Sequence, residues 1–261
     1  MKVLIMIVSI YLFSFAPKQL KLGENMPEAI VITPVKDSLK TTKLTIRAIL
    51  KTKADIEYYV FNDFSQPETK RYLDDAKNKL GFNVVHLEDI TDTHSPNYKL
   101  VLETAQSMAI AKDCPLIIVE SDVIVKPNTI PNLLSIAKEN DNAGMVGAIT
   151  VSKRGNYNYP YTFEKLKSDD TISTSHSISF CCTLITNKFL GKIDFKSLSQ
   201  NKDWYDVHIS QQSRKMGFNN YLAKGTEVLH RPHSSRPWKD LKYSNPILYY
   251  MKKILLRRDR I

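Results

Sequence analysis

Cysteine is scarce in this chain of 261 residues, which contains only Cys114, Cys181 and Cys182. Their number is odd and two of them are adjacent, a pattern that argues against a disulfide framework and favours a reducing cytoplasm. The sequence also has no CxxC pair and no Cys/His spacing of the zinc-binding kind. We therefore expect neither a disulfide-stapled protein nor a zinc finger.

A long apolar run is missing as well. The N-terminal run from Val3 to Ala16 has 14 residues, which is shorter than the ~20 needed to span a bilayer. Its flanking lysines give no clear orientation, and no convincing small-residue cleavage site follows it. Three interpretations of residues 1–27 stay open: a core strand or helix of the domain, a membrane-touching anchor, or a cleaved signal.

Acidic residues are outnumbered. The chain has 27 Asp and Glu against 37 Lys and Arg, which gives a net charge of +10 and a pI near 9.3. Such a surface favours anionic partners, namely phosphorylated substrates, anionic lipid or nucleic acid. A nucleic-acid-binding surface would cluster its basic residues with exposed aromatics on one element, whereas here they are dispersed until the C-terminal tail. We therefore expect no nucleic-acid partner.

Strand and helix signals alternate through the first half of the chain, and no internal repeat is present. The expected strands are 29–34, 56–61, 83–87, 116–119 and 145–151. The expected helices are 39–51, a helix that begins around Pro67 and stops at Gly81, 98–112 and 127–139. This alternation predicts an α/β protein with a mainly parallel, doubly wound central sheet and right-handed crossovers.

The second half has a different pattern. Residues 152–177 are polar and predict a long mobile loop. A strand over 177–186, a helix over 203–216 closed by Gly217, and a strand over 220–229 should follow. We expect one domain over 28–240, with halves 28–151 and 152–240, and a basic amphipathic helix within 241–261.

Two acids follow the most apolar strand. Leu116 to Val119 form an uninterrupted apolar run, typical of a strand buried on both faces, and Glu120 and Asp122 come directly after it. Ligands bind at the carboxyl ends of such strands. Two carboxylates there can share Mg²⁺ or Mn²⁺, because these ions prefer oxygen ligands and keep positions open for phosphate.

Four short motifs lie in order between residues 28 and 233. They are Ile30–Val35, Tyr59–Ser65, Val119–Asp122, and Trp204–Ile209 with Arg214–Phe218 behind it, and Val228–His230 follows them. Their order and spacing resemble the family 2-like glycosyltransferases of the GT-A (nucleotide-diphospho-sugar transferase) fold. The resemblance implies a three-layer αβα sandwich with a nucleotide-sugar-binding first half and an acceptor-binding second half.

The resemblance also implies the roles of individual residues. The metal, Mn²⁺ or Mg²⁺, would be bound by Glu120, Asp122 and His230, and Asp206 would be the catalytic base. The nucleotide-diphospho-sugar donor would contact Thr33, Pro34, Asp63, Ser121, Arg231 and Arg236, and the acceptor side would hold Trp204 and Tyr205. Cys181 and Cys182 are either acceptor-side or structural residues, because cysteines on a strand more often pack in the core. Tyr205 departs from the family pattern, which usually has an acid there.

Several of these residues also have a purely structural interpretation. Asp203 would be the N-cap of its helix, which places Asp206 at N3, where acids favour the helix dipole. Asp63 could cap a turn, and His230 could be a satisfied histidine at a strand end. The basic C-terminal helix could be either a solvated end or a contact with anionic lipid.

The function that follows is a metal-dependent, inverting glycosyltransferase of cell-surface polysaccharide or glycoconjugate assembly. Its acceptor would be a sugar or a lipid-linked sugar, and its location the cytoplasm, with peripheral contact at the inner face of the membrane left open. A nucleotidyltransferase is the enzymatic alternative, although the first strand lacks the Gly-rich basic loop that it would need. A non-catalytic carbohydrate-binding or nucleic-acid-binding relative is the other.

Overall fold

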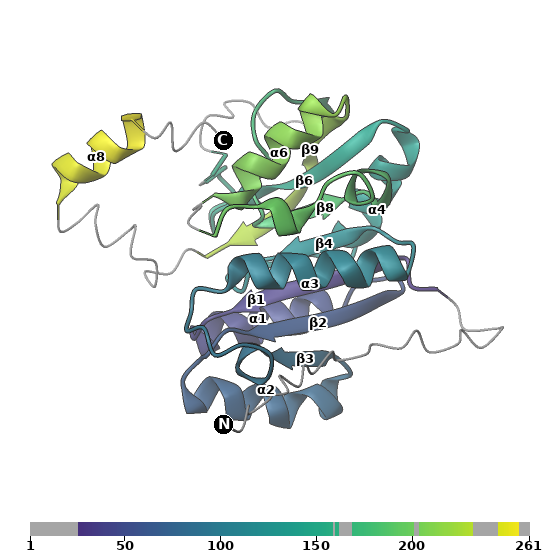
Figure 1. The fold of residues 1–261 in the computed structure, drawn as a ribbon. Coiled ribbons are helices and arrows are strands. Elements are labelled where there is room, and N and C mark those ends of the chain that lie inside the picture. The colour runs from purple at the N-terminus through teal and green to yellow at the C-terminus, as the bar shows by residue number, and fades with distance from the viewer. Residues whose placement is uncertain (1–25, 159, 162–168, 201–203, 232–244, 256–261) are drawn as a thin grey trace, which may run out of the picture.

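The structure is a computed structural model that describes residues 26–255 apart from 159, 162–168, 201–203 and 232–244 (Figure 1). Almost all of the N-terminal segment 1–27 therefore lies outside the described residues, as do Asp203 and Arg236. Among the described residues no helix is long and apolar enough to cross a membrane.

The first half alternates strands and helices as predicted. Its elements are β1 Ala29–Val35, α1 Leu39–Ile49, β2 Ile56–Asn62, α2 Pro67–Leu80, β3 Asn83–His86, η1 Leu87–Asp89, α3 Tyr98–Ala111, β4 Leu116–Val119, β5 Val123–Ile124, α4 Thr129–Glu139 and β6 Ala143–Val151. The second half consists of β7 Thr171–Ser173, β8 Cys182–Ile185, α5 Asn187–Leu190, η2 Phe195–Ser197, α6 Tyr205–Lys215, β9 Asn219–His230 and α8 Pro246–Leu255.

Within the described residues the strands form one nine-stranded sheet in the order β3-β2-β1-β4-β8-β6-β9-β5, and β7 pairs with β9. The strands β1, β2, β3, β4, β6 and β9 run in one direction. In contrast, β8 runs antiparallel between β4 and β6, and the short β5 and β7 run antiparallel to β9. The sheet is thus mainly parallel, as the alternation predicted.

Helices cover both faces of this sheet, which makes three layers (Figure 1). On β1, Ile30 and Ile32 belong to one apolar core with α3, α5 and α6, whereas Ala29 and Val31 belong to the other with α1, α2 and α4. Both faces of a central strand must be apolar in such an arrangement. This is why the strand patterns are continuous rather than alternating, and the predicted αβα architecture is confirmed.

Two glycines end helices, as predicted. Both have positive φ angles, which residues with a Cβ rarely adopt. Gly81 caps α2 at φ +78°, and Gly217 follows α6 at φ +85°. Left-handed glycines at this position satisfy the last carbonyls of a helix. Each glycine turns the chain directly into a strand, β3 after Gly81 and β9 after Gly217.

Two expectations for the second half need correction. Residues 152–177 are not a structureless loop: Tyr157 bridges to Val151, Tyr161 is buried, and β7 pairs with β9. The strand predicted over 177–186 is confined to β8, because the chain before it turns inward at Ile178 and Phe180. The sequence pattern also missed the two-residue strand β5, which is too short to give a periodic signal.

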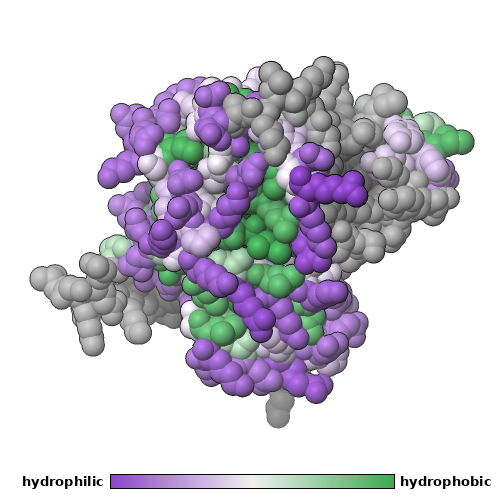
Figure 2. Space-filling view, turned by 180° about the vertical axis from the view of Figure 1, so that it is seen from behind, coloured by the Kyte–Doolittle hydropathy of each residue, from purple (hydrophilic) through white to green (hydrophobic). Residues whose placement is uncertain are grey.

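The C-terminal helix α8 lies outside the three layers (Figure 1). Tyr249 is buried, whereas Ile247, Tyr250, Met251 and Leu255 are exposed. Seen from behind, the surface of the layers is hydrophilic around its rim with apolar residues near its centre, and the apolar end of α8 projects at the right (Figure 2). The helix predicted within 241–261 is therefore present over Pro246–Leu255.

Candidate active site

Strand directions bring three distant chain segments to one edge of the sheet. Glu120 and Asp122 leave the carboxyl end of β4, and β9 runs the same way, so its last residue, His230, arrives at the same edge. Because β8 runs the opposite way, its beginning lies there too. The pairing of Val119 with Cys182 places Cys181 beside Glu120, and β5 pairs Val123 with His230.

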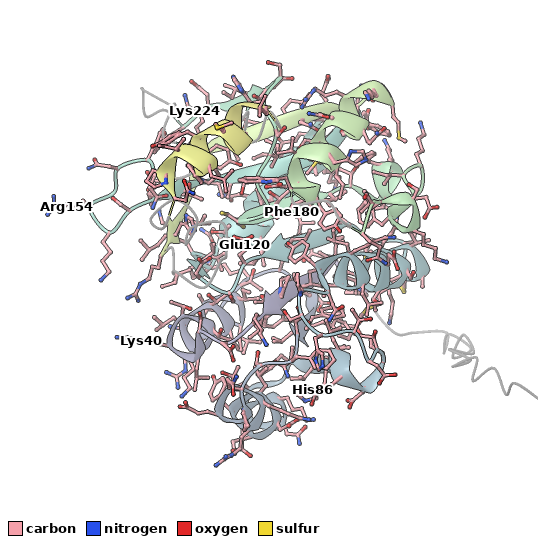
Figure 3. All side chains as sticks on the ribbon, turned by 60° about the vertical axis from the view of Figure 1, so that its left-hand side comes forward. Lys40, His86, Glu120, Arg154, Phe180 and Lys224 are labelled. Atoms are coloured by element: carbon pink, nitrogen blue, oxygen red, sulfur yellow. The ribbon has the colours of Figure 1, made fainter. Side chains whose placement is uncertain are left out.

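Glu120, Cys181 and His230 converge at this edge. Each offers one ligand atom, and these atoms lie within 4.8 Å of one another. The Cys181 Sγ is 3.6 Å from Glu120 Oε2, and the Glu120 backbone N–H donates to the Cys181 carbonyl at 3.1 Å. Glu120 lies next to Phe180 in the middle of the molecule, whereas His86 and Lys224 lie toward its two ends (Figure 3). Carboxylate, imidazole and thiol groups together are a donor set that fits a divalent metal ion.

Asp122 lies beside this group. Its side chain is buried, and its Oδ2 is 3.6 Å from His230 Nε2. Its carbonyl accepts a hydrogen bond from the Arg231 backbone N–H at 2.9 Å. Ser121, between the two acids, is buried as well. His230 therefore lies on the same edge as the two acids, as its predicted ligand role requires, although that role and that of Asp122 remain predictions.

The helix α6 presents Asp206 from its first turn. Its N-cap is Trp204 at φ +80°, not Asp203, so Asp206 is at N2 rather than the predicted N3. The Asp206 Oδ1 accepts a hydrogen bond from the Val207 backbone N–H at 2.9 Å. Because Trp204 takes a left-handed conformation, the helix begins later than the sequence pattern indicated.

Tyr161, which gave no signal in the sequence, is buried beside the segment that carries Cys181. Burial raises the pKa of Tyr161 well above its usual range, and nearby Cys181 and Asp206 raise it further. Its hydroxyl accepts a hydrogen bond from the Ser179 backbone N–H at 3.0 Å. The Ser179 hydroxyl in turn donates to the Cys181 sulfur at 3.4 Å, so one residue, Ser179, contacts both Tyr161 and Cys181.

An aromatic stack fixes the start of α6. Tyr98 lies between Phe180 and Tyr205, with ring centroids 6.3 Å and 6.2 Å away and interplanar angles of 24° and 11°. The Tyr205 hydroxyl donates to the Ser199 carbonyl at 2.9 Å. Tyr205 thus packs in the core, and Trp204 packs against the same core, while the predicted acceptor-side roles of both residues stay predictions. Cys182 is fully buried in the sheet.

On the other half of the sheet, Asp63 ties two loops together. Its carboxylate accepts hydrogen bonds from the Ser95 hydroxyl at 2.7 Å and from the backbone and side-chain N–H groups of Asn97 at 3.0 and 2.9 Å. Its own N–H donates to the Val35 carbonyl at 2.9 Å. Thr33 is fully buried and its hydroxyl accepts from the Tyr58 hydroxyl at 2.9 Å. The predicted contact of Thr33 with the nucleotide-sugar donor stays a prediction.

Three residues in the loops beside Asp63 have strained backbone angles. Asp37, Ser38 and Phe64 have φ values of 57°, 53° and 53°, each costing about 1–2 kcal/mol relative to ordinary angles. The loops are held to each other, because the Lys36 ammonium donates to the Phe64 carbonyl and the Asp37 N–H donates to the Ser65 hydroxyl. Strain of this kind persists where the surrounding structure enforces it, often at binding loops.

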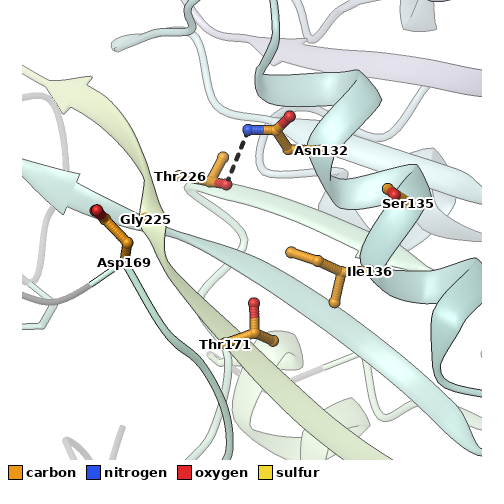
Figure 4. Close-up of a pocket in the computed structure, with 7 residues that line it drawn as sticks. All are labelled: Asn132, Ser135, Ile136, Asp169, Thr171, Gly225 and Thr226. Carbon is orange, nitrogen blue, oxygen red and sulfur yellow. Dashed lines mark hydrogen bonds between the residues drawn. The ribbon is translucent and has the colours of Figure 1, made fainter.

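A separate cavity of about 290 Å³ lies between α4 and an irregularity of β9 (Figure 4). The Asn132 side chain crosses its edge to the Thr226 hydroxyl at 3.5 Å, and Asp169 approaches the backbone at Gly225. None of the predicted site residues lines it. The edge that carries Glu120, Cys181 and His230 is therefore distinct from this cavity.

The fold is similar to those of solved glycosyltransferases. Mannosyltransferase PcManGT from Pyrobaculum calidifontis, in complex with GDP-Man and Mn²⁺, aligns with a TM-score of 0.61 at 14% identity over 89% of this chain and 65% of that chain. TarS 1-349 of S. aureus aligns with a TM-score of 0.61 at 15% identity, over 78% and 60%. GalNAc-T7 with UDP, GalNAc and Mn²⁺ gives 0.60 at 12% identity, over 82% and 45%.

These likenesses establish the fold, and the chain spans less than two thirds of the length of each of the three structures. No curated protein sequence matches the chain significantly. Residues 30–193 match glycosyl transferase family 2, and because this match covers more than half of the 261 residues, the chain belongs to that family.

Proposed function

We propose that this glycosyltransferase depends on a divalent metal and transfers a sugar from a nucleotide-diphospho-sugar to an acceptor hydroxyl with inversion. The observation that carries the proposal is the convergence of Glu120, Cys181 and His230, with Asp122 beside them, at the carboxyl edge of the sheet. This is the edge where α/β folds bind their ligands. The similar structures with GDP-Man or UDP and Mn²⁺ support the same donor class.

In the proposed reaction, this edge stabilises the leaving group. A metal bound there would supply charge neutralisation for the departing diphosphate. Glu120, Asp122 and His230 would hold that metal, and the Arg231 side chain, at the end of β9, would add a positive charge for the phosphates. Arg236, proposed for the same purpose, lies outside the described residues. Thr33, Pro34, Asp63 and Ser121 are the proposed contacts to the rest of the donor.

Asp206 is the proposed base. The acceptor oxygen attacks the anomeric carbon, the bond from that carbon to the diphosphate oxygen breaks, and the acceptor proton passes to the Asp206 carboxylate. Because the acceptor oxygen attacks the anomeric carbon on the face opposite the departing diphosphate, this direct displacement inverts the configuration of that carbon. The stack of Tyr98 with Phe180 and Tyr205 holds the first turn of α6 in place, which positions the base before substrates bind. Trp204 and Cys182 complete the proposed acceptor side.

A membrane acceptor is supported by α8. Five large apolar side chains of this helix are exposed, namely Ile247, Leu248, Tyr250, Met251 and Leu255, and Lys252, Lys253, Arg257 and Arg258 lie in the same stretch of sequence. Such a combination binds the interface of an anionic bilayer. We propose that α8 docks the enzyme on the inner face of the membrane, where it would reach a lipid-linked acceptor for cell-surface polysaccharide or glycoconjugate assembly.

Replacing Asp122 by Asn tests the metal. The variant should lose turnover by ~10²-fold or more and bind the donor more weakly, because metal stabilisation of the leaving group contributes several kcal/mol. Chelation of the wild type with EDTA should have the same effect. Asp141→Asn is the matched control, since that side chain is 98% exposed. Full activity in EDTA would contradict the metal dependence.

Asp206→Asn separates catalysis from capping. The amide keeps an oxygen for the Val207 N–H but cannot take the acceptor proton. Turnover should fall ~10²–10⁴-fold with donor affinity almost unchanged, because the loss is confined to the transition state. A purely capping role would cost ~1 kcal/mol of stability or less. Asp194→Asn, which removes a capping charge elsewhere, is the control for melting temperature and turnover.

For Asp63, donor contact and loop bracing can be distinguished with two variants. Asp63→Ala should lower the free energy of unfolding by about 2–3 kcal/mol, because buried donors lose a charged acceptor, and should raise the donor KM. Asn97→Ala removes the side-chain hydrogen bond of Asn97 to Asp63 but keeps the Asp63 carboxylate. An equal rise in donor KM for both variants would assign Asp63 to bracing alone.

Vesicle co-sedimentation tests the membrane contact. The wild-type protein should sediment with phosphatidylglycerol vesicles and not with phosphatidylcholine, and binding should weaken in high salt because the attraction is screened. The double variant Met251→Glu, Leu255→Glu should lose binding. Ile90→Glu, an exposed apolar residue on another element, should not. Equal binding by the double variant and the wild type would rule out α8 as the contact.

A further inference from the structure

A buried cysteine forms part of the group that converges at the catalytic edge. Cys181 is 2% exposed, and its sulfur is 3.6 Å from a Glu120 carboxylate oxygen. The ligand atoms of Cys181, Glu120 and His230 lie within 4.8 Å of one another. Nothing in the Val119–Asp122 motif requires a sulfur at this place. The antiparallel register of β8 against β4 puts it there, 61 residues further along the chain.

The Cys181 sulfur and the Glu120 carboxylate oxygen are spaced as two ligands of one ion would be. Ligands at about 2.0–2.3 Å from a tetrahedral ion lie about 3.3–3.8 Å apart, and the Sγ to Oε2 distance of 3.6 Å falls in this interval. The sheet fixes this spacing, because the Glu120 N–H donates to the Cys181 carbonyl at 3.1 Å. The Ser179 hydroxyl donates to the Cys181 sulfur at 3.4 Å, the type of outer contact that orients a metal ligand.

We propose, on the basis of the metal-dependent function proposed above, that Cys181 is a direct ligand of the metal together with Glu120 and His230. Thiolate sulfur is a soft ligand, whereas carboxylate oxygen is hard. A site with one sulfur therefore binds Zn²⁺ and Co²⁺ more tightly than a site of oxygen and nitrogen alone, and it gains nothing for Mg²⁺. Cys181 thus determines which metal the enzyme selects.

The rival explanation is a hydrogen bond. If the Cys181 thiol only donates to Glu120 and orients it, sulfur never touches the metal. Replacement by Ser, which also donates, would then preserve the binding of all divalent ions to a similar degree. The two explanations differ in the spectrum of a bound ion and in metal selectivity, and neither difference depends on catalysis.

Cobalt titration of the full-length protein distinguishes them. Co²⁺ added to the metal-free wild type should produce a near-ultraviolet thiolate-to-metal charge-transfer band, and Cys181→Ser should abolish it. In calorimetric titrations the same variant should bind Zn²⁺ at least ~10-fold more weakly, with Mg²⁺ affinity little changed. Cys114→Ser is the matched control, because that cysteine is also buried but lies before β4, at the opposite edge of the sheet.

Each result has a defined meaning. A charge-transfer band that survives in Cys181→Ser, or Co²⁺ binding without any such band, would overturn the ligand role of Cys181 while leaving the metal-dependent function intact. Absence of Co²⁺, Mn²⁺ and Mg²⁺ binding to the wild type would overturn both. The wild-type spectrum is informative by itself, so the test remains decisive if the Ser variant does not fold.

Discussion

The antiparallel pairing of β8 with β4 is the constraint on which the candidate active site depends. The strands β3, β2, β1 and β4 are parallel, and the direction first reverses at β8. This reversal puts the beginning of β8, with Cys181, against the end of β4, with Glu120. Parallel β9 then delivers His230 to the same edge. A shift of one residue in the register between β8 and β4 would move the Cys181 side chain to the other face of the sheet, away from Glu120 and His230.

The parts of this architecture that depend on local pattern were predictable. The family resemblance and the αβα fold are confirmed, because continuous apolar strands and helix-stopping glycines are signals carried by a few neighbouring residues. The acids after β4 belong to the same class of signal. In contrast, the convergence of Cys181 with Glu120 depends on the register between two strands that are far apart in sequence. The hydrophobic periodicity of each strand carries no information about that register. The sequence alone therefore suggested an acceptor-side role for Cys181.

Deviations from prediction also have local physical causes. The left-handed conformation of Trp204 delays the start of α6, so Asp206 sits at N2. The polar stretch after β6 looked structureless because its order comes from tertiary contacts, namely the buried Tyr161 and the pairing of β7 with β9. Tyr161 itself gave no signal, although Ser179 contacts both its hydroxyl and the Cys181 sulfur. Secondary-structure propensity depends on the residues of one segment, whereas these features depend on contacts with other parts of the chain.

The reversal at β8 also separates the two proposed substrates. On its parallel side, the loops after β1 and β2 are strained. Hydrogen bonds of Lys36 to the Phe64 carbonyl and of the Asp37 N–H to the Ser65 hydroxyl hold these loops to each other, a framework that suits the proposed nucleotide contact. On its other side, the first turn of α6 rests on an aromatic stack and presents Asp206. The group of Glu120, Cys181 and His230 lies at the boundary, where the diphosphate of the proposed donor would have to cross. One change of strand direction would therefore set the order of the proposed donor contacts, metal ligands and base along this edge.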